Sequence, residues 1–281
     1  MKIIKFIKIN SYGNDFVISK NKRIKKKFLY NRNFGLGFDQ LIIFKIKKNK
    51  KIIAKIYNSD LSEAYNCANG LRCLSFYILK KTKLKKINIY TVSRKHFFFF
   101  LKKNVVTEKL KKFNYNFLKS VVFDYKNMFF RNVKKSLQIN FYLYRLYFQF
   151  IELGNFHIVF FIKKKKDIKK VLKKKSEFNN SNISFLEFKK NKIKTLENGV
   201  GFTLSCGSGT FASCISYSLC KPKKKKIFLK NKVGTLFFLN KKRKYYLTGK
   251  CLFLFYGKFF IKVHDNRSKE KKIRQRNLKK Y

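Results

Sequence analysis

The sequence has no tryptophan, one proline and only 13 acidic residues against 70 lysines and arginines, which gives its 281 residues a net charge of +57. Such a charge attracts polyanions, so a basic nucleic-acid-binding protein is one candidate class. The lysines, however, recur in almost every block of ten residues, among abundant Ile, Asn, Phe and Tyr. This even spread favours compositional drift toward residues with AT-rich codons over a dedicated basic face, and we expect no specific nucleic-acid partner.

Export and membrane-anchoring segments are also missing. Lys2, Lys5 and Lys8 interrupt the apolar start of the chain, and the longest apolar region, residues 141–162, is broken by charged and polar side chains. We therefore expect a cytoplasmic protein with no membrane partner, in which the six cysteines are thiols. The chain has no CxxC pair, which argues against a zinc site.

The chain does contain a large stock of apolar residues, 45% of the total with 34 Phe and 16 Tyr, which is ample for a folded core. Runs of alternating apolar and polar residues, rich in Ile, Val, Phe and Tyr, are typical of half-buried strands. The clearest runs lie at residues 2–9, 41–48, 51–58, 86–92, 182–188 and 232–239. This pattern predicts an α+β fold in which strands dominate.

Two segments have helical periodicity, and each begins directly after a cysteine, Cys67 or Cys206. The two cysteines open similar motifs, CANGLRC and CGSGTFASC, which lie about half the chain apart. This weak internal repeat predicts two pseudo-symmetric β-rich domains, each a curved sheet or barrel wrapped around a central helix.

We expect the first domain at residues 1–115 and the second at 116–263, with the boundary inside the irregular run LKKFNYNFLKS. The last strand of the second domain is a candidate to return to the first domain. Residues 264–281 form a basic, nearly all-polar tail, which is typical of a disordered segment.

A cysteine at the first turn of a helix has distinctive chemistry. The helix N-terminus exposes unpaired N–H groups and a partial positive charge. A thiolate there is stabilised, and its pKa can fall from about 8.5 toward neutrality. Gly70, Gly207 and Gly209 would let the backbone approach a carboxylate closely. Each half therefore offers a candidate base beside an anion-binding site.

If the two halves face each other, the two thiols can flank one carbon atom from opposite sides. One sulfur, as thiolate, removes a proton while the other, as thiol, delivers one to the opposite face, which inverts a stereocentre. A protease-type nucleophile would need a histidine partner instead of a second, mirrored cysteine. The chain has neither a GxGxxG nor a GxxxxGK[ST] loop, so we expect no cofactor and no metal.

Taken singly, every cysteine is also consistent with a small core residue. That is the simplest interpretation of the other four, Cys73, Cys214, Cys220 and Cys251. Only their mirrored motifs set Cys67 and Cys206 apart. His96, which precedes four phenylalanines, is expected to be a surface residue at a strand end.

Six motifs resemble those of the diaminopimelate epimerases, which work without pyridoxal phosphate. In chain order they are YGNDFVI at 12–18, FGLGFDQL at 34–41, YNSDLSEAYNCANGLRC at 57–73, LGNFHIV at 153–159, NISF at 182–185 and ENGVGFTLSCGSGT at 197–210. Their order and spacing agree over essentially the whole chain, so the set is far more specific than any one motif.

The resemblance implies an active site in the cleft between the two domains and conversion of LL-2,6-diaminopimelate to the meso form, for lysine and peptidoglycan precursor synthesis. It implies Cys67 and Cys206 as the catalytic base and acid, with support from His157 and Glu197. The partner is a small amino-acid substrate, with a possible homodimer. Substrate-binding residues carried over by position are Asn14, Gln40, Asn58, Ala68, Asn69, Asn155, Asn182, Glu197, Asn198, Gly207 and Ser208.

Three positions depart from the family pattern. Asn198 stands where the family has an arginine for a substrate carboxylate, and a lysine elsewhere would not reproduce a bidentate arginine. Phe202 replaces a glutamate, and Ala68 replaces a glycine. The missing arginine leaves open a second hypothesis, a related cofactor-free racemase or epimerase that acts on another amino acid.

Overall fold

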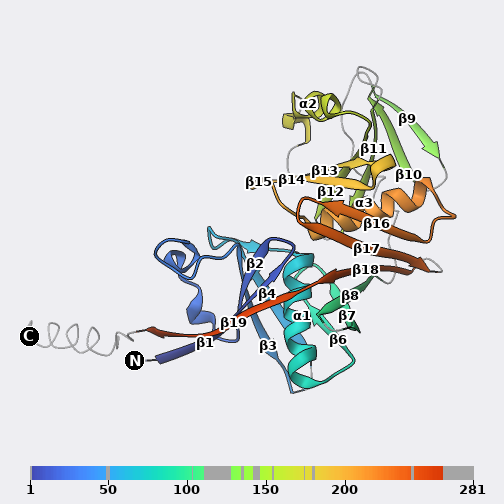
Figure 1. Cartoon of the computed structure of the whole chain (residues 1–281). Coiled ribbons are helices and arrows are strands. Elements are labelled where there is room, and N and C mark those ends of the chain that lie inside the picture. Colours follow the sequence, from blue (N-terminus) through green and yellow to red (C-terminus); the bar gives the residue numbers. More distant parts are fainter. Residues whose placement is uncertain are drawn as a thin grey trace, which may run out of the picture.

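The computed structural model describes residues 2–48, 51–102, 104–110, 128–133, 136–141, 146–153, 155–173, 175–178, 181–241 and 244–261. The expected domain boundary falls mainly on residues 111–127, and the expected disordered tail on residues 264–281. Both lie outside the described residues. Figure 1 shows how the described elements are arranged.

Three α-helices lie within the described residues: α1 (Ala68–Thr82), α2 (Lys165–Lys173) and α3 (Gly207–Cys220). The two helices predicted after the cysteines are confirmed, since Cys67 and Cys206 are the N-cap residues of α1 and α3. The sequence did not reveal α2, because KKDIKKVLK is mostly charged, although Val171 packs into a core of the C-terminal half. Short 3-10 helices lie at Lys22–Ile24, Lys27–Tyr30, Lys175–Phe178 and Phe188–Lys190.

Strands make up most of the remaining structure. In the N-terminal half they are β1 (Lys2–Ser11), β2 (Asn14–Ser19), β3 (Gln40–Ile46), β4 (Ile52–Tyr57), β5 (Glu63–Ala64), β6 (Lys86–Tyr90), β7 (Lys95–Lys102) and β8 (Val105–Leu110). In the C-terminal half they are β9 (Met128–Val133), β10 (Ser136–Phe141), β11 (Leu146–Glu152), β12 (Phe156–Ile162), β13 (Asn182–Glu187), β14 (Lys192–Glu197), β15 (Gly201–Phe202), β16 (Lys226–Asn231), β17 (Gly234–Lys241), β18 (Lys244–Lys250) and β19 (Leu252–Ile261). The six strands predicted from alternation are all present, as β1, β3, β4, β6, β13 and β17.

The two halves repeat one order of strand pairing. In the first half, β2 is parallel to β3, and β3 is antiparallel to β4. The strand β4 pairs antiparallel with the short β5 and parallel with β6. The strand β7 then pairs antiparallel with β6, and β8 pairs antiparallel with β7. In the second, β12 to β18 repeat each relation in the same order. The helix α1 follows β5 in the chain and α3 follows β15, so the two helices take equivalent places in the two halves. The predicted fold class, α+β with two pseudo-symmetric halves, is confirmed.

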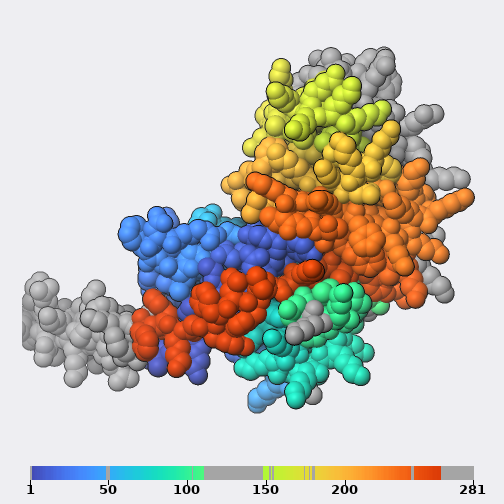
Figure 2. Space-filling model, in the orientation of Figure 1, coloured from blue at the N-terminus to red at the C-terminus, as the bar shows by residue number. Residues whose placement is uncertain are grey.

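Two strand pairings tie the halves together. The strand β18 pairs antiparallel with β8 of the N-terminal half, and β19 pairs with β1 along its length. Figures 1 and 2 show this last strand, in red, lying across the N-terminal half. The end of the described chain is thus built into the half that contains its beginning.

Each long helix is the centre of a hydrophobic core. In α1, Leu71, Leu74 and Ile78 pack among strand residues of the N-terminal half, and in α3, Phe211 and Ile215 do so in the C-terminal half. Full burial of one such side chain contributes roughly 1.5–3 kcal/mol. Because strands surround each helix, packing fixes where its N-terminus points, and therefore where its cysteine lies.

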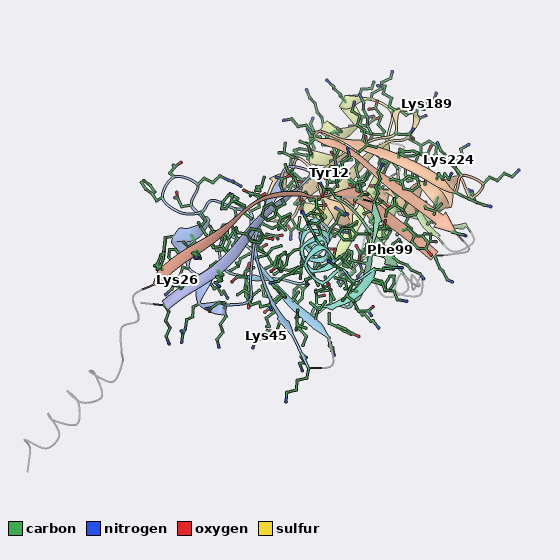
Figure 3. All side chains as sticks on the ribbon, turned by 60° about the horizontal axis from the view of Figure 1, so that its bottom comes forward. Tyr12, Lys26, Lys45, Phe99, Lys189 and Lys224 are labelled. Atoms are coloured by element: carbon green, nitrogen blue, oxygen red, sulfur yellow. The ribbon has the colours of Figure 1, made fainter. Side chains whose placement is uncertain are left out.

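Lysines cover both halves of the molecule. Lys26 and Lys45 project from the N-terminal half, and Lys189 and Lys224 from the C-terminal half (Figure 3). The positive charge is therefore spread over both halves, as the even composition suggests. Within the described residues, no helix combines the length and the apolar character that crossing a membrane requires.

His96 does not lie on the surface, so that prediction was wrong. It is 1% exposed; its Nδ1 lies 2.9 Å from Oε1 of Glu108, and Arg94 donates to the same oxygen at 2.8 Å. The prediction used sequence neighbours alone, whereas the β6–β7 hairpin turns the ring inward against β8. Burial raises the pKa of Glu108, but the charge of Arg94 and the bond to His96 outweigh it and lower this pKa to about 2.

We expect Glu108→Gln to destabilise the protein by about 3–5 kcal/mol at pH 7, because it leaves the largely buried Arg94 charge without a partner. Since the pKa of Glu108 in the folded protein lies below its ordinary value of 4.5, this contribution is complete above pH 4.5 and is lost as the pH falls through about 2. Urea unfolding at pH 7 and pH 3 measures both effects.

Glu187→Gln is the matched control, because it removes an ion pair with the exposed Lys190 in the other half. It should cost less than about 1 kcal/mol. Equal losses in the two variants would contradict the structural role of Glu108.

Candidate active site

Both cysteines cap their helices with their own side chains. The Sγ of Cys67 accepts a hydrogen bond from the backbone N–H of Gly70 at 3.3 Å, and that of Cys206 accepts one from Gly209, also at 3.3 Å. Each cysteine has extended backbone, as an N-cap residue should, so its sulfur turns back over the first helical turn. The sulfurs therefore lie at the positive ends of α1 and α3.

The N-termini of α1 and α3 abut. A Cβ on Gly207 would lie 2.6 Å from Oδ1 of Asn69 and 3.0 Å from Cβ of Ala68, so the close approach of the helices requires this glycine. Asn69 bridges the junction, because its Nδ2 donates to the backbone oxygen of Ser205 at 3.2 Å and to Oδ1 of Asn14 at 3.1 Å. The alanine at position 68 is accommodated because its methyl group faces a glycine.

A cavity of about 850 Å³ opens at this junction, with both cysteines on its wall. Among its described lining residues Arg32 is the one cation, beside the carboxylates of Asp39, Asp60 and Glu197. The chain has 70 lysines and arginines, but Arg32 is the one that lines the described part of this wall. All but two of the site residues predicted from the sequence line it: Asn14, Gln40, Asn58, Cys67, Ala68, Asn69, Asn155, Glu197, Asn198, Cys206, Gly207 and Ser208.

The other two, Asn182 and His157, contact lining residues from outside the wall. Oδ1 of Asn182 accepts a hydrogen bond from the backbone N–H of Asn198 at 3.0 Å. His157 is fully buried, with its Nε2 3.1 Å from Oδ1 of Asn155. Burial lowers the pKa of His157 to about 3, so the imidazole is neutral near pH 7. Its contacts support the lining residue Asn155, and an effect on the thiols stays a prediction.

The amide side chains of the site follow the internal repeat. Gln40, which opens β3, donates through Nε2 to Oδ1 of Asn58, just after β4, at 2.8 Å. Asn182, which opens β13, accepts from the N–H of Asn198, just after β14. Each half thus contributes one linked pair at equivalent positions. Neutral amides both donate and accept, which suits a ligand that carries ammonium and carboxylate groups together.

Burial holds both thiols in their protonated form near pH 7. It raises the pKa of Cys67 to about 12, although the N–H of Gly70 and the charge of Arg72 act in the opposite direction. The pKa of Cys206 is also raised, by burial first and then by the charges of Glu197 and Cys67. The prediction of pKa values near neutrality was wrong, because loss of water around each sulfur outweighs the helix. Because a thiolate on one cysteine raises the pKa of the other, at most one of the two sulfurs is ionised at a time.

Glu197 lies beside the second thiol, since each of the two groups shifts the pKa of the other. Oγ1 of Thr203 donates to Oε1 of Glu197 at 2.6 Å. Burial raises the pKa of Glu197, and its polar contacts lower this pKa less than burial raises it. A carboxylate with a raised pKa beside a thiol is a suitable proton acceptor. Across the described part of the chain, no three His, Cys, Asp or Glu side chains gather in a way that could hold a metal ion.

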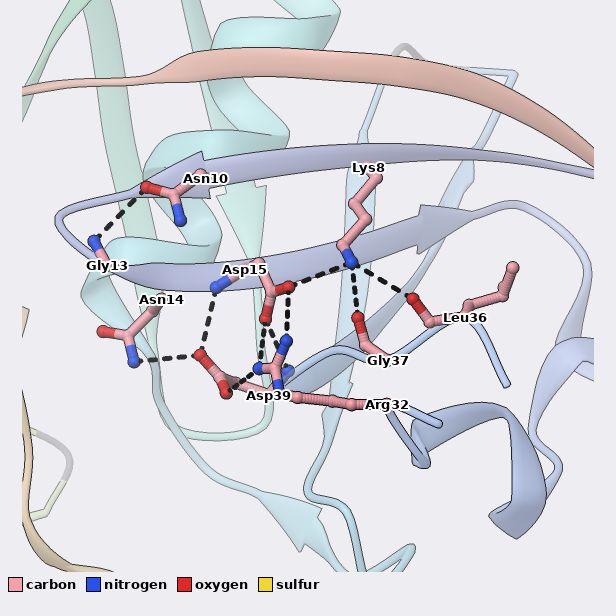
Figure 4. A network of polar contacts seen from close by, with 9 residues as sticks. All are labelled: Lys8, Asn10, Gly13, Asn14, Asp15, Arg32, Leu36, Gly37 and Asp39. Atoms are coloured by element: carbon pink, nitrogen blue, oxygen red, sulfur yellow. Dashed lines mark hydrogen bonds and ion pairs between the residues drawn. The ribbon is translucent and has the colours of Figure 1, made fainter. Parts of the chain in front are cut away.

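An ion-pair network beside the cavity was not found from the sequence. Arg32 donates to both carboxylate oxygens of Asp15, at 3.0 and 2.9 Å, and to Asp39 at 2.7 Å, while Lys8 lies 3.0 Å from Asp15 (Figure 4). Asp39 also accepts from Nδ2 of Asn14 at 3.2 Å, so the network orients a lining side chain. A signal existed, because Asp15 and Asp39 are two of only 13 acids and both lie inside the recognised motifs.

A second cavity, of about 960 Å³, shares the segment 203–206 with the first. Nine of its lining residues are lysines, and its one carboxylate, on Glu187, is paired with Lys190. Lysines therefore enter this cavity freely but are missing from the wall that holds both cysteines. The two cavities therefore differ in charge, and the one that holds both cysteines is the less basic.

The fold matches that of known amino-acid epimerases. It resembles a hydroxyproline epimerase from Agrobacterium vitis with a TM-score of 0.60 and 9% identity, over 93% of this chain and 94% of that one. It also resembles a predicted epimerase from Pseudomonas aeruginosa with a TM-score of 0.65 and 8% identity, over 92% of this chain and all of that one. These matches define the class of fold, the one that both epimerases share with this chain.

Similarity in sequence shows which family the chain belongs to. No protein-family model matches the chain. It is 30% identical to the diaminopimelate epimerase of Buchnera aphidicola subsp. Baizongia pistaciae over 92% of this chain and 96% of the relative. It is 33% identical to the diaminopimelate epimerase of Wigglesworthia glossinidia brevipalpis over 83% of this chain and 91% of the relative. The chain belongs to the diaminopimelate epimerase family.

We expect alkylation of Cys67 by iodoacetamide to accelerate about tenfold per pH unit between pH 7 and pH 9. The raised pKa leaves a small thiolate fraction that grows tenfold with each unit. Peptide mass spectrometry measures the rate at each cysteine, and the exposed Cys220 reports reagent quality in the same sample. A Cys67 rate that levels off below pH 8 would contradict the raised pKa.

Proposed function

We propose that this chain is a cofactor-independent epimerase that converts LL-2,6-diaminopimelate to the meso form. One observation carries the proposal: two thiols, each capping a helix N-terminus, lie on the wall of one cavity where the two halves meet. Membership of the family supports the choice of substrate. The product would serve lysine and peptidoglycan precursor synthesis in the cytoplasm.

In the proposed reaction one cysteine, as thiolate, takes the α-proton and leaves a carbanion. The other cysteine, as thiol, then gives its proton to the opposite face of the same carbon. The two sulfurs exchange protonation states, so the reverse reaction uses the same pair with the roles exchanged. Glu197 is suited to accept the Cys206 proton, because its carboxylate lines the same cavity as that thiol and its pKa is raised.

We assign the substrate contacts to the wall of the thiol cavity. The backbone N–H groups of Asn69, Gly207 and Ser208 belong to the positive helix ends and would bind the carboxylate on the reacting carbon. The side-chain amides that line the cavity would bind the ammonium groups and the distal end of the substrate, and Asn182 would act by holding Asn198. These lining amides are Asn14, Gln40, Asn58, Asn155 and Asn198.

In heavy water, deuterium should enter the α-carbon as meso product appears, because the delivered proton comes from an exchangeable thiol. Cys67→Ser and Cys206→Ser should each lower kcat by at least about 10²-fold, the usual contribution of a general acid or base. Chiral chromatography with mass spectrometry measures turnover and label together. Cys220→Ser, at an exposed position, should stay within about twofold of wild type. Full turnover in either active-site variant would overturn the two-thiol mechanism.

One observation favours a second candidate function, a related racemase or epimerase of another amino acid. No lysine lines the described wall of the cavity beside the exposed Asn198, so nothing there replaces the arginine of the family pattern. Arg32 already forms ion pairs with Asp15 and Asp39. A shorter amino acid needs no cation at this end, and its turnover in the absence of diaminopimelate turnover would favour this candidate.

Asn198→Arg should lower the KM for diaminopimelate about tenfold and change kcat by less than about threefold. A guanidinium can hold the distal carboxylate through two hydrogen bonds in both the ground state and the transition state. The side chain is exposed, and its anchoring bond to Asn182 uses the backbone N–H, so the fold should tolerate the change. Steady-state kinetics decide, with Asn198→Gln as the neutral control. An unchanged KM in the arginine variant would show that the distal carboxylate does not bind beside position 198.

The proposal includes a homodimer and neither a cofactor nor a specific nucleic-acid partner. Exposed apolar side chains along β19, Leu252, Tyr256 and Phe260, offer a surface for a second copy. Light scattering of the purified protein tests the dimer.

A further inference from the structure

Arg72 is a fully buried arginine close to both helix N-termini, and the proposed mechanism does not use it. Its side chain is 0% exposed, although arginine is almost never fully buried unless it is paired. No carboxylate in the described part of the chain forms an ion pair with it. Its Nε and NH2 groups have no hydrogen-bond partner among the described residues. A buried cation left in this state needs an explanation.

The contacts of Arg72 place it where the two halves join. NH1 donates to Oδ1 of Asn69 at 2.8 Å and to Oγ of Ser11, at the end of β1, at 3.3 Å. A Cβ on Gly249 in β18 would lie 3.0 Å from the guanidinium carbon, so a glycine makes room for the charge. Asn69 in turn donates to Ser205, just before Cys206. The guanidinium therefore fixes the residue that bridges α1 to the start of α3.

Among the described residues, the charge of Arg72 acts to lower the pKa values of Glu108, Cys73 and Cys67. Glu108 is one, but its carboxylate is already bound by Arg94 and His96. The Cys73 thiol is another, and it is enclosed in the core of the N-terminal half. Cys67 is the third, and it alone lies on the wall of the thiol cavity.

The other charged groups that face Cys67 oppose its ionisation. Glu197 raises the pKa of Cys67, and Cys206 and Cys67 disfavour each other's thiolates. Besides backbone N–H groups of the first helical turn, Arg72 is the group that acts in the opposite direction. Moving a cation out of water costs several kcal/mol even after relaxation, and a nearby anion offsets that cost.

We propose that Arg72 is a positioning residue of the active site: it holds Asn69 between the two helix N-termini, and it places a buried cation, with no ion-pair partner in the described part of the chain, on the helix that Cys67 caps. The inference rests on the proposed function, in which the thiolate is the base. Arg72 itself does not line the cavity, so it acts through the lining residue Asn69, to which it is hydrogen-bonded, and through its charge.

The charge is tested by alkylation of Cys67 with iodoacetamide at pH 8, followed by peptide mass spectrometry. Arg72→Gln should react about tenfold more slowly than wild type, and Arg72→Lys should stay within about threefold. Lys55→Gln is the matched control, because it removes a cation of the same half whose charge is already paired with Glu63. It should stay within about twofold. An unchanged rate in folded Arg72→Gln, or an equal loss in Lys55→Gln, would overturn the inference.

The positioning role is tested by kinetics of Arg72→Lys. An ammonium keeps the charge but cannot reproduce the planar guanidinium toward Asn69 and Ser11, so kcat should fall about tenfold with KM within about twofold. A wild-type kcat in Arg72→Lys would overturn the positioning role. This test does not depend on Arg72→Gln, so it holds even if circular dichroism shows that Arg72→Gln does not fold. The alkylation readout needs no substrate, so a wild type without epimerase activity would sink the proposed function and leave this test standing.

Discussion

The contact between the N-termini of α1 and α3 is the constraint on which the rest of the structure depends. Each helix start carries roughly half a positive charge, so bringing two of them together is unfavourable unless something offsets the repulsion. Gly207 removes the steric obstacle, and Asn69 joins the two sides through Asn14 and Ser205. The remaining positive field favours a carboxylate and a thiolate, which are the two anions that the proposed chemistry brings together.

Two helix ends stay opposed only if each helix is held from all sides. The strands of each half supply that support, and the pairings of β18 with β8 and of β19 with β1 keep the halves in register. Lysine is tolerated on the outward faces of these strands and in the loops between them, because its ammonium group can reach water there. It is excluded from the described wall of the thiol cavity, where an added cation would compete for the bound carboxylate.

Local periodicity was enough to predict α1, α3 and six strands, because their apolar residues follow the spacing of a single element. It failed for α2, which has only three apolar residues, Ile168, Val171 and Leu172, of which Val171 alone is fully buried in the core. The motifs predicted fourteen site residues, of which twelve line one wall, but the contacts of Arg72 with Ser11, of Arg32 with Asp15 and of His96 with Glu108 join separate elements, which no local pattern reveals. The thiol pKa values were misjudged for the same reason, since desolvation is set by the assembled cavity and not by the helix alone.

Desolvation makes the two sulfurs hard to ionise, and this sets the energetic problem of the site. Burial raises the pKa of Cys67 to about 12, so the Cys67 thiolate is a minor form at pH 7. One helix end supplies at most about 2 kcal/mol. Several further interactions must therefore act together, and the same loss of water that raises the cost also strengthens each of them. A thiolate that forms only when these groups converge stays a poor target for stray electrophiles and oxidants, which couples its reactivity to the substrate that completes the site.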